Sequence, residues 1–422
     1  MDAVLVGILG IIVLLIVLFI LGMPVGFAMA VVGFCGFSYV ITPQAALNMI
    51  ATDLWTTFSK YGLTVIPLFI LMGYLAFNAG IAERLYDAAY KWVGHWRGGL
   101  AIATIAADEM FAAICGSNTA TAATMGAVAL PQMDKYNYDT RLSTGTVVTG
   151  GTLGTVMPPS VVLIIIGLQT EQSIVKLFLA GILPAIALGL LFVITIIVLC
   201  RIYPSFGPAG PKTSLADKLK SLLGIIEAVT IFALVIGGLY FGVFTPTEAG
   251  AAGVLITLVV SFATRKLTWK GFIRSIGDTL KISCMVYMLV TGAIIFGRFL
   301  AVTRLPFIVA DFAASLPVSP YVILVMVMVI YLLGGCFMDS LGFLVLTNPI
   351  WYAIVLTMVT TMGAITPPVG VNIYVVKALA PDIELGTIFK SVAFFLLACI
   401  GSIILLIIFP QLALILPNAM FD

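Results

Sequence analysis

Two polar stretches interrupt long apolar sequence and constrain the fold more than any other feature of the chain. Residues 115–121 read Cys-Gly-Ser-Asn-Thr-Ala-Thr, and residues 150–160 read Gly-Gly-Thr-Leu-Gly-Thr-Val-Met-Pro-Pro-Ser. In hydrocarbon every backbone N–H and C=O needs a partner, so broken helix at membrane depth is tolerated only where it is buried in protein or lines a cavity. Freed carbonyls with Ser, Asn and Thr oxygens suit a small hard cation. The two stretches therefore indicate a buried binding site.

The second half of the chain repeats both stretches in the same order. Residues 336–340 match residues 115–119 in position and kind, and residues 363–368 match residues 154–159 with the shared form Gly-x-x-x-Pro-Pro. Paired helix-breaking segments in corresponding halves of an apolar chain are the best sequence indication of a secondary transporter's site. The ordered pair is a much stronger signal than either string alone.

The composition predicts an all-α polytopic membrane protein. Of the 422 residues 62% are hydrophobic and only 9% are charged, against about 25% charged in a soluble domain. The apolar run at 4–21 predicts a first span and not a cleaved signal. A net charge of +2 without a basic face excludes a nucleic-acid role. The single histidine and scattered cysteines argue against a zinc or haem site, and no organic cofactor is expected.

Hydropathy divides this single membrane unit, residues 1–422, into two related halves with scaffold helices before and between them. The arms beside the first polar tip are each too short to span the bilayer, so together they predict a re-entrant hairpin. The predicted regions are N-terminal scaffold helices at 1–60, a first repeat at 61–200 (hairpin 98–130, broken helix 142–168), a linker at 201–221, central scaffold helices at 222–280 and a second repeat at 281–422 (hairpin around 321–347, broken helix 350–376).

Basic residues gather in the linker at 201–221 and in the loop at 265–274. Two predicted spans separate these loops, so they lie on one side of the membrane, and the positive-inside rule makes that side cytoplasmic. Residues 78–97 mix charged and aromatic side chains, which predicts an amphipathic helix on the membrane surface. His95 belongs to that surface segment.

The second half is shorter than the first between its two motifs. Asn118 and Pro158 are 40 positions apart, whereas Asp339 and Pro367 are 28 apart. Symmetry predicts that the end of a hairpin arm and its loop are missing near residues 347–348, through a deletion or through residues left out of the sequence. A Cα–Cα distance there well above the roughly 3.8 Å of a trans peptide is the expected sign of an omission.

The chain resembles the large membrane subunit of tripartite ATP-independent periplasmic (TRAP) transporters over essentially its whole length. The resemblance rests on residues 116–123 (Gly-Ser-Asn-Thr-Ala-Thr-Ala-Ala), 150–160, 244–250 (Phe-Thr-Pro-Thr-Glu-Ala-Gly), 363–370 (Gly-Ala-Ile-Thr-Pro-Pro-Val-Gly) and the shorter 21–26 (Leu-Gly-Met-Pro-Val-Gly). It implies an elevator-type secondary transporter in the lipid of the bacterial inner membrane. Two inverted repeats, each with a re-entrant hairpin and a broken helix, form a mobile domain against a scaffold.

The same resemblance implies the partners and the energy source. The partners are a small four-helix membrane subunit and a soluble periplasmic binding protein that delivers the substrate. Transport is sodium-driven uptake of an organic acid such as a C4-dicarboxylate or sialic acid, with Na+ as the coupling ion. ATP is not used, which agrees with the absence of a Gly-x-x-x-x-Gly-Lys-[Ser/Thr] motif.

Carried over onto this sequence, the resemblance implies two sodium sites and a substrate site between the hairpin tips. The implied ligands of the first sodium are Ser117, Asn118 and carbonyls near Gly154, Met157 and Pro159. Those of the second are Asp339, Ser340 and carbonyls near Gly363, Thr366 and Pro368. Helix N-termini and hydroxyls meet the substrate carboxylate, and the candidate substrate residues are Thr119, Thr121, Ser160 and Arg298.

Several residues allow more than one interpretation. Arg298 neutralises a substrate carboxylate, or snorkels, or pairs with a protein carboxylate. Asp108 and Glu109 stand where the family generally has small or apolar residues. They either lie at a wetted cavity wall or subunit interface, or they serve a proton or cation role. Glu248 is expected to cap the helix that begins at Pro246.

Two other functions compete with the tripartite transporter. An intramembrane enzyme needs a nucleophile–base pair or a metal site, and the lone His95 far from the motifs offers neither. No enzyme activity and no catalytic residue are therefore expected. A stand-alone sodium/divalent-anion symporter needs no binding protein, and only the family strings favour the tripartite system over it.

Overall fold

The chain folds into helices joined by short turns. The computed structural model describes residues 2–318, 320–337, 350–367 and 370–421, and no strand occurs among them. Seven of the described helices are long and apolar enough to cross a membrane, or eight if the bent pair at 215–240 forms one span. The prediction of an all-α polytopic membrane protein is confirmed. The expected gap near 347–348 lies outside the described residues.

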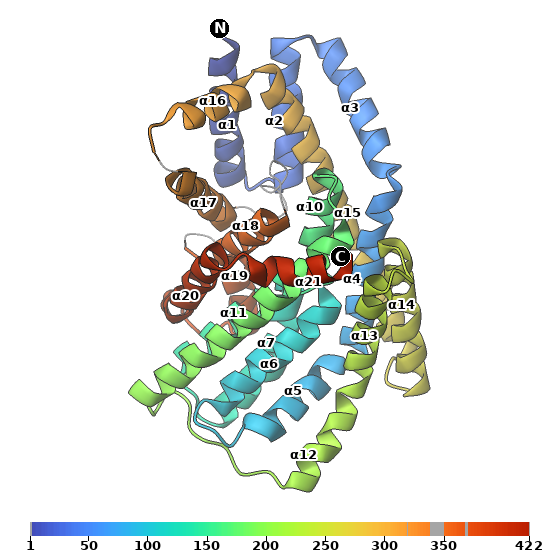
Figure 1. Cartoon of the computed structure of the whole chain (residues 1–422), viewed down its shortest axis with the longest axis vertical. Coiled ribbons are helices and arrows are strands. Elements are labelled where there is room, and N and C mark those ends of the chain that lie inside the picture. Colours follow the sequence, from blue (N-terminus) through green and yellow to red (C-terminus); the bar gives the residue numbers. More distant parts are fainter. Residues whose placement is uncertain (1, 319, 338–349, 368–369, 422) are drawn as a thin grey trace.

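One part of the molecule, here called the scaffold group, is built around the longest helix. This is α15 (Trp269–Val302). Packed around it or next to it are α1 (Ala3–Ile20), α2 (Val25–Val40), α3 (Pro43–Phe58), η1 (Tyr61–Thr64), α4 (Val65–Asn78), α13 (Ile226–Tyr240) and α14 (Pro246–Ala263). The chain turns sharply at Pro24, so α1 and α2 are two helices and not one kinked span (Figure 1).

Glycines let α2 approach α15 closely. A Cβ on Gly26 would lie 2.8 Å from the Leu289 backbone, one on Gly33 would lie 2.8 Å from Phe296 Cα, and one on Gly292 would overlap the Gly26 carbonyl. Small residues at such crossings allow backbone contact between membrane helices, where packing drives association. The α2–α15 contact is therefore the most intimate one in the scaffold group.

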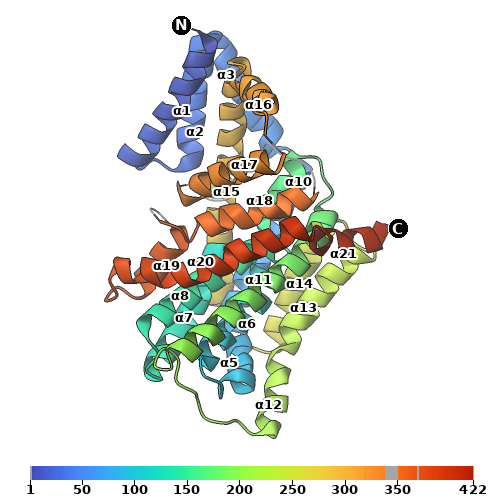
Figure 2. The same cartoon turned by 60° about the vertical axis from the view of Figure 1, so that its left-hand side comes forward.

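The second part, here called the hairpin group, holds most of the other helices. They are α5 (Ile81–Val93), α6 (Gly99–Cys115), α7 (Asn118–Lys135), α8 (Thr140–Gly150), α9 (Leu153–Val156), α10 (Val161–Gln169), α11 (Ile174–Ile202), α18 (Ile350–Gly363), α19 (Val371–Leu379), α20 (Leu385–Ile408) and α21 (Gln411–Phe421). Helices α6, α11 and α20 run side by side obliquely across the molecule (Figure 2). Between the groups in sequence lie α12 (Leu215–Ser221), η2 (Leu222–Gly224), α16 (Leu305–Ser315) and α17 (Pro320–Phe337).

Helix starts follow capping signals in the sequence. Thr245 and Glu248 form a capping box, in which Glu248 Oε2 accepts from Thr245 N at 2.8 Å. Pro246 fits the first turn because its missing N–H has no helical partner there. The predicted capping role of Glu248 is confirmed.

Some observed helices cross the bounds of the predicted regions or pack outside them. Helix α4, predicted in the first repeat, packs mainly on α14 and α15 of the scaffold group. The boundary at 280/281 falls inside α15, because its polar first turns continue the apolar helix without a breaker. The second arm of the first hairpin, α7, continues to Lys135 through Pro131, since one proline removes a single helical hydrogen bond and membrane proteins tolerate this. The linker also contains the short helix α12.

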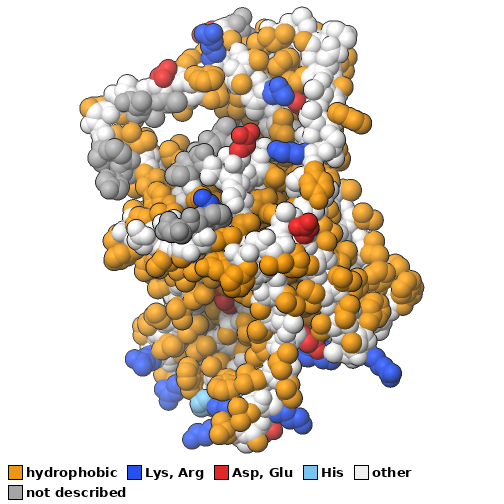
Figure 3. Space-filling model, turned by 45° about the vertical axis from the view of Figure 1, so that its right-hand side comes forward, with side chains coloured by type: hydrophobic (Ala, Val, Ile, Leu, Met, Phe, Trp, Pro, Cys, Tyr) orange, Lys and Arg blue, Asp and Glu red, His pale blue; other side chains and the backbone are white. Residues whose placement is uncertain are grey.

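The two basic loops share one end of the molecule. Lys266 Nζ lies 3.1 Å from Glu227 Oε1 in the first turn of α13, and Arg84 of α5 pairs with the other oxygen of Glu227. Lys and Arg side chains gather at the lower end in Figure 3, and hydrophobic side chains cover the middle. This end of the molecule is called the basic end below.

We expect Gly292→Ala to destabilise the protein by about 1–3 kcal/mol, because the new methyl must push α2 away from α15. Gly297→Ala is the matched control on the same helix, since its Cβ would meet nothing within 4 Å. The control should be neutral or slightly stabilising. Thermal unfolding in detergent measures both, and equal midpoints for the two variants would contradict the packing argument.

Candidate functional site

Helices α6 and α7 pack against each other as a helical hairpin whose tip is polar. The turn is made by Gly116, which has φ +64°, and by Ser117, which caps α7. Asn118 Oδ1 accepts from the Thr119 backbone N–H at 2.6 Å, and the Thr121 hydroxyl donates to Ser117 O at 2.8 Å. The turn between α6 and α7 therefore lies at the residues predicted for the tip, 117–119.

The first broken helix comprises α8, the short α9 and α10. Between α9 and α10 the chain runs without helical bonding through Met157 to Ser160. The Ser160 hydroxyl donates to Thr155 O at 2.5 Å and accepts from Leu163 N at 3.4 Å, so it closes one helix and caps the next. Two consecutive prolines remove two donors here, which reduces the number of backbone groups that need partners.

The hairpin tip packs directly on this break. The Val161 backbone N–H donates to Gly116 O at 3.3 Å, and a Cβ on Gly116 would overlap Pro159 O. A Cβ on Gly154 would lie 2.5 Å from Ser117 O. The glycines therefore allow carbonyl oxygens from both elements to meet.

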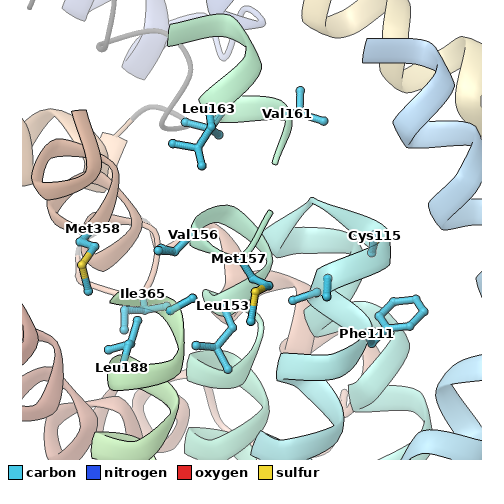
Figure 4. Close-up of a cluster of buried hydrophobic side chains, with 14 of the residues drawn as sticks. Phe111, Cys115, Leu153, Val156, Met157, Val161, Leu163, Leu188, Met358 and Ile365 are labelled. Atoms are coloured by element: carbon cyan, nitrogen blue, oxygen red, sulfur yellow. The ribbon is translucent and has the colours of Figure 1, made fainter. Parts of the chain in front are cut away.

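Buried apolar side chains also pack at the contact between the hairpin tip and the first break. Figure 4 shows Phe111 and Cys115 of α6 in one buried cluster with Leu153, Val156 and Met157 of the break. The five residues predicted for the first sodium site thus lie on two elements that the structure brings together.

A cavity of about 530 Å³ opens beside the tip, between the two groups. Ser117, Asn118, Thr119 and Thr155 contribute its polar wall on the hairpin side. Its scaffold wall comes from α4 and α15 and consists of Tyr74, Arg274, Asp278, Ile282, Met285 and Val286 among others. Because α15 starts at the basic end, the cavity reaches from the tip toward that end.

The remaining predicted substrate residues lie away from this cavity. Thr121 and Ser160 are fully buried, and their hydroxyls donate to backbone carbonyls. Arg298 Nη2 pairs with Asp53 Oδ1 of α3 at 2.7 Å, in a second cavity of about 270 Å³ that Lys60 also lines. Of the interpretations offered for Arg298, the structure has the pairing with a protein carboxylate.

The second break joins α18 and α19. The Thr366 backbone N–H donates to Gly363 O at 3.0 Å, and its hydroxyl donates to Met362 O at 2.7 Å. Asn372 Nδ2 donates to Val148 O at 3.2 Å, which ties α19 to α8. The other predicted ligands of the second sodium lie outside the described residues; these are Asp339, Ser340 and Pro368.

Comparison with known proteins identifies the family. Residues 12–412 match the family model of the tripartite ATP-independent periplasmic transporter, DctM component. The chain belongs to this family. It is 33% identical to the C4-dicarboxylate TRAP transporter large permease DctM of Pseudomonas aeruginosa, over 88% of this chain and 90% of that protein. It is 30% identical to the sialic acid TRAP transporter large permease SiaM of Vibrio cholerae, over 94% of this chain and 95% of that protein.

As a TRAP large permease, the chain is a transport protein and not an enzyme, which confirms that prediction. Family membership and the span-capable helices place it in the inner membrane as a multi-pass protein.

Two polar residues of this TRAP permease were not singled out from the sequence. Thr155 Oγ1 is buried without a hydrogen-bond partner beside the first break, and Asn372 Oδ1 is likewise unpartnered just after the second. Buried polar atoms normally have partners, so such exceptions point to an absent ligand or water. The sequence signal that could have pointed to these two residues is a polar side chain near each Pro-Pro motif.

We expect Gly116→Ala to disrupt the contact between tip and break, because it adds a clash with Pro159 O to the strain of a left-handed residue. Gly22→Ala is the control, since Gly22 has φ +60° but a Cβ there would meet nothing within 4 Å. The strain alone costs about 1–2 kcal/mol. Thermal unfolding should show a clearly larger loss for Gly116→Ala, and equal losses would argue against the close contact.

Proposed function

We propose that this TRAP permease imports an organic acid by sodium-driven, elevator-type transport. The observation that carries the proposal is the contact of the polar hairpin tip with the first break at the wall of the larger cavity. Oxygen atoms for a cation and a helix N-terminus for an anion occur there side by side.

The first sodium site comprises Ser117, Asn118, Gly154, Met157 and Pro159. The donor set fits Na+, because it consists of carbonyl, hydroxyl and amide oxygens, which are the ligands of hard cations. The nearby Thr155 hydroxyl oxygen, buried and without a partner, supports an ion or water at this place. The second site is proposed by correspondence at Asp339 and Ser340, with carbonyls of Gly363, Thr366 and Pro368.

The substrate carboxylate binds in the cavity at the N-terminus of α7. Helix α7 begins at Asn118, so the positive end of its dipole favours an anion there. The Thr119 hydroxyl lines the same wall. Relatives are named for C4-dicarboxylate, sialic acid and ectoine transport, and the substrate proposed here is a carboxylate of that size range.

Movement of the hairpin group against the scaffold group carries the site across the membrane. The cavity between the groups reaches toward the basic end, which the positive-inside rule makes cytoplasmic, so this is an inward-facing arrangement. The proposed partners are the small membrane subunit and a periplasmic binding protein. A stand-alone symporter is the weaker candidate, because the relatives are named as large permeases of TRAP systems.

Sodium should stabilise the purified permease specifically. A ligand at a hundred times its Kd stabilises the native state by about 2.7 kcal/mol, so the unfolding midpoint should rise in sodium relative to potassium or choline. Asn118→Ala should weaken this rise by removing a side-chain oxygen, and Asp339→Ala should do so at the second site.

Thr195→Ala is the control for these substitutions. Its hydroxyl donates to Leu191 O within α11, so the loss of that hydroxyl should leave the sodium effect unchanged. Equal midpoints in sodium and potassium for the folded wild-type complex would refute sodium coupling. Co-purification with a small four-helix subunit separates the tripartite system from a stand-alone symporter.

A further inference from the structure

Asp108 and Glu109 are neighbouring carboxyl groups in the hairpin arm α6. Asp108 is 0% exposed, and neither of its oxygens has a hydrogen-bond partner in the described part of the chain. Both oxygens of Glu109 are also buried and unpartnered, although part of the residue reaches the surface. An ionised carboxylate buried without a partner costs several kcal/mol, and two adjacent ones also repel each other.

Each carboxyl is accommodated by a glycine on a different helix. A Cβ on Gly150 would overlap Asp108 Oδ2, and a Cβ on Gly189 would overlap Glu109 Oε2. Gly150 is the last residue of α8, the first segment of the broken helix, and Gly189 lies in the middle of α11. The space for both carboxyls is therefore part of the packing of the hairpin group.

No cation compensates this pair among the described residues. Glu109, the next residue on the same helix, is the titratable neighbour of Asp108 in α6. Several charged side chains on the helices packed against α6 are in ion pairs of their own: Arg84 with Glu227, Asp87 with Lys91, and Arg141 with Asp139. Two tyrosines have other neighbours, Tyr86 beside Thr104 and Tyr74 beside Cys115. The remaining charged groups lie toward helix ends: Asp134 and Lys135 in the last turn of α7, and Lys176 and Arg201 at the ends of α11. Lys176 and Arg201 are 13 and 12 residues from Gly189, about 18–20 Å along the helix.

We propose that Asp108 and Glu109 form a proton-binding site inside the hairpin group. Both carboxyls are neutral in the packed state. Ionisation of Asp108, with its proton passing to water, loosens the contact between α6 and α8. This site makes the stability of the hairpin group depend on pH. The proton-binding site uses none of the residues of the proposed sodium sites, so the two proposals can be tested independently.

Thermal and chemical unfolding of the purified full-length protein in sodium-free potassium buffer, from about pH 6 to about pH 9, tests the proposal. A buried acid binds its proton more tightly in the native state, so stability is highest at low pH and falls as pH rises. For one linked proton the unfolding equilibrium constant rises up to tenfold per pH unit. Asp108→Asn, which mimics the neutral acid, should flatten this dependence, and Glu109→Gln should flatten it in part.

Asp87→Asn is the matched control, because Asp87 is an exposed carboxylate on α5 and should leave the pH slope as in the wild type. The same slope in wild type and Asp108→Asn overturns the proposal. If Asp108→Asn does not fold, infrared spectroscopy of the wild type decides: a carbonyl band of protonated carboxylic acid at neutral pH that vanishes at high pH supports the site. The absence of that band at neutral pH overturns it.

Discussion

The need to pair every backbone polar group inside an apolar protein governs this structure. At the first break the helix gives up its own hydrogen bonds, and the hairpin tip replaces one of them through Val161 N–H and Gly116 O. Glycine at 116 and 154 lets the two backbones come close enough to do so. Carbonyl oxygens of the tip and the break come close together there, and this is the place where the binding site is proposed.

The site lies where the hairpin group meets the scaffold group. One wall of the larger cavity comes from the hairpin tip and the other from α4 and α15. A ligand held there contacts both groups, so its binding energy depends on how the groups are placed. Glycines bring α2 tightly against α15, and we infer that in the proposed elevator movement the hairpin group is the part that changes position.

Local signals made much of this predictable. The helical class follows from apolar runs, the tip from Gly-Ser-Asn-Thr, the first break from Pro-Pro, and the cap at Glu248 from its spacing to Thr245. Contacts between distant segments were not predictable, since no local pattern encodes them. The pairing of Arg298 with Asp53 and the placement of α4 are of this kind. Asp108 stood out in the sequence, but its glycine neighbour across the helix contact did not.

Both cavities border α15 through residues spaced by four. Asp278, Ile282 and Val286 line the larger cavity, and Val290, Ile294 and Arg298 line the smaller one. Four residues exceed one turn of 3.6 by about 40°, so this row winds slowly around the helix, by about 200° from first to last residue. The two cavities therefore open on different sides of α15. If the hairpin group stays in contact with this row in the proposed elevator movement, it must rotate about α15 as it passes from one cavity to the other.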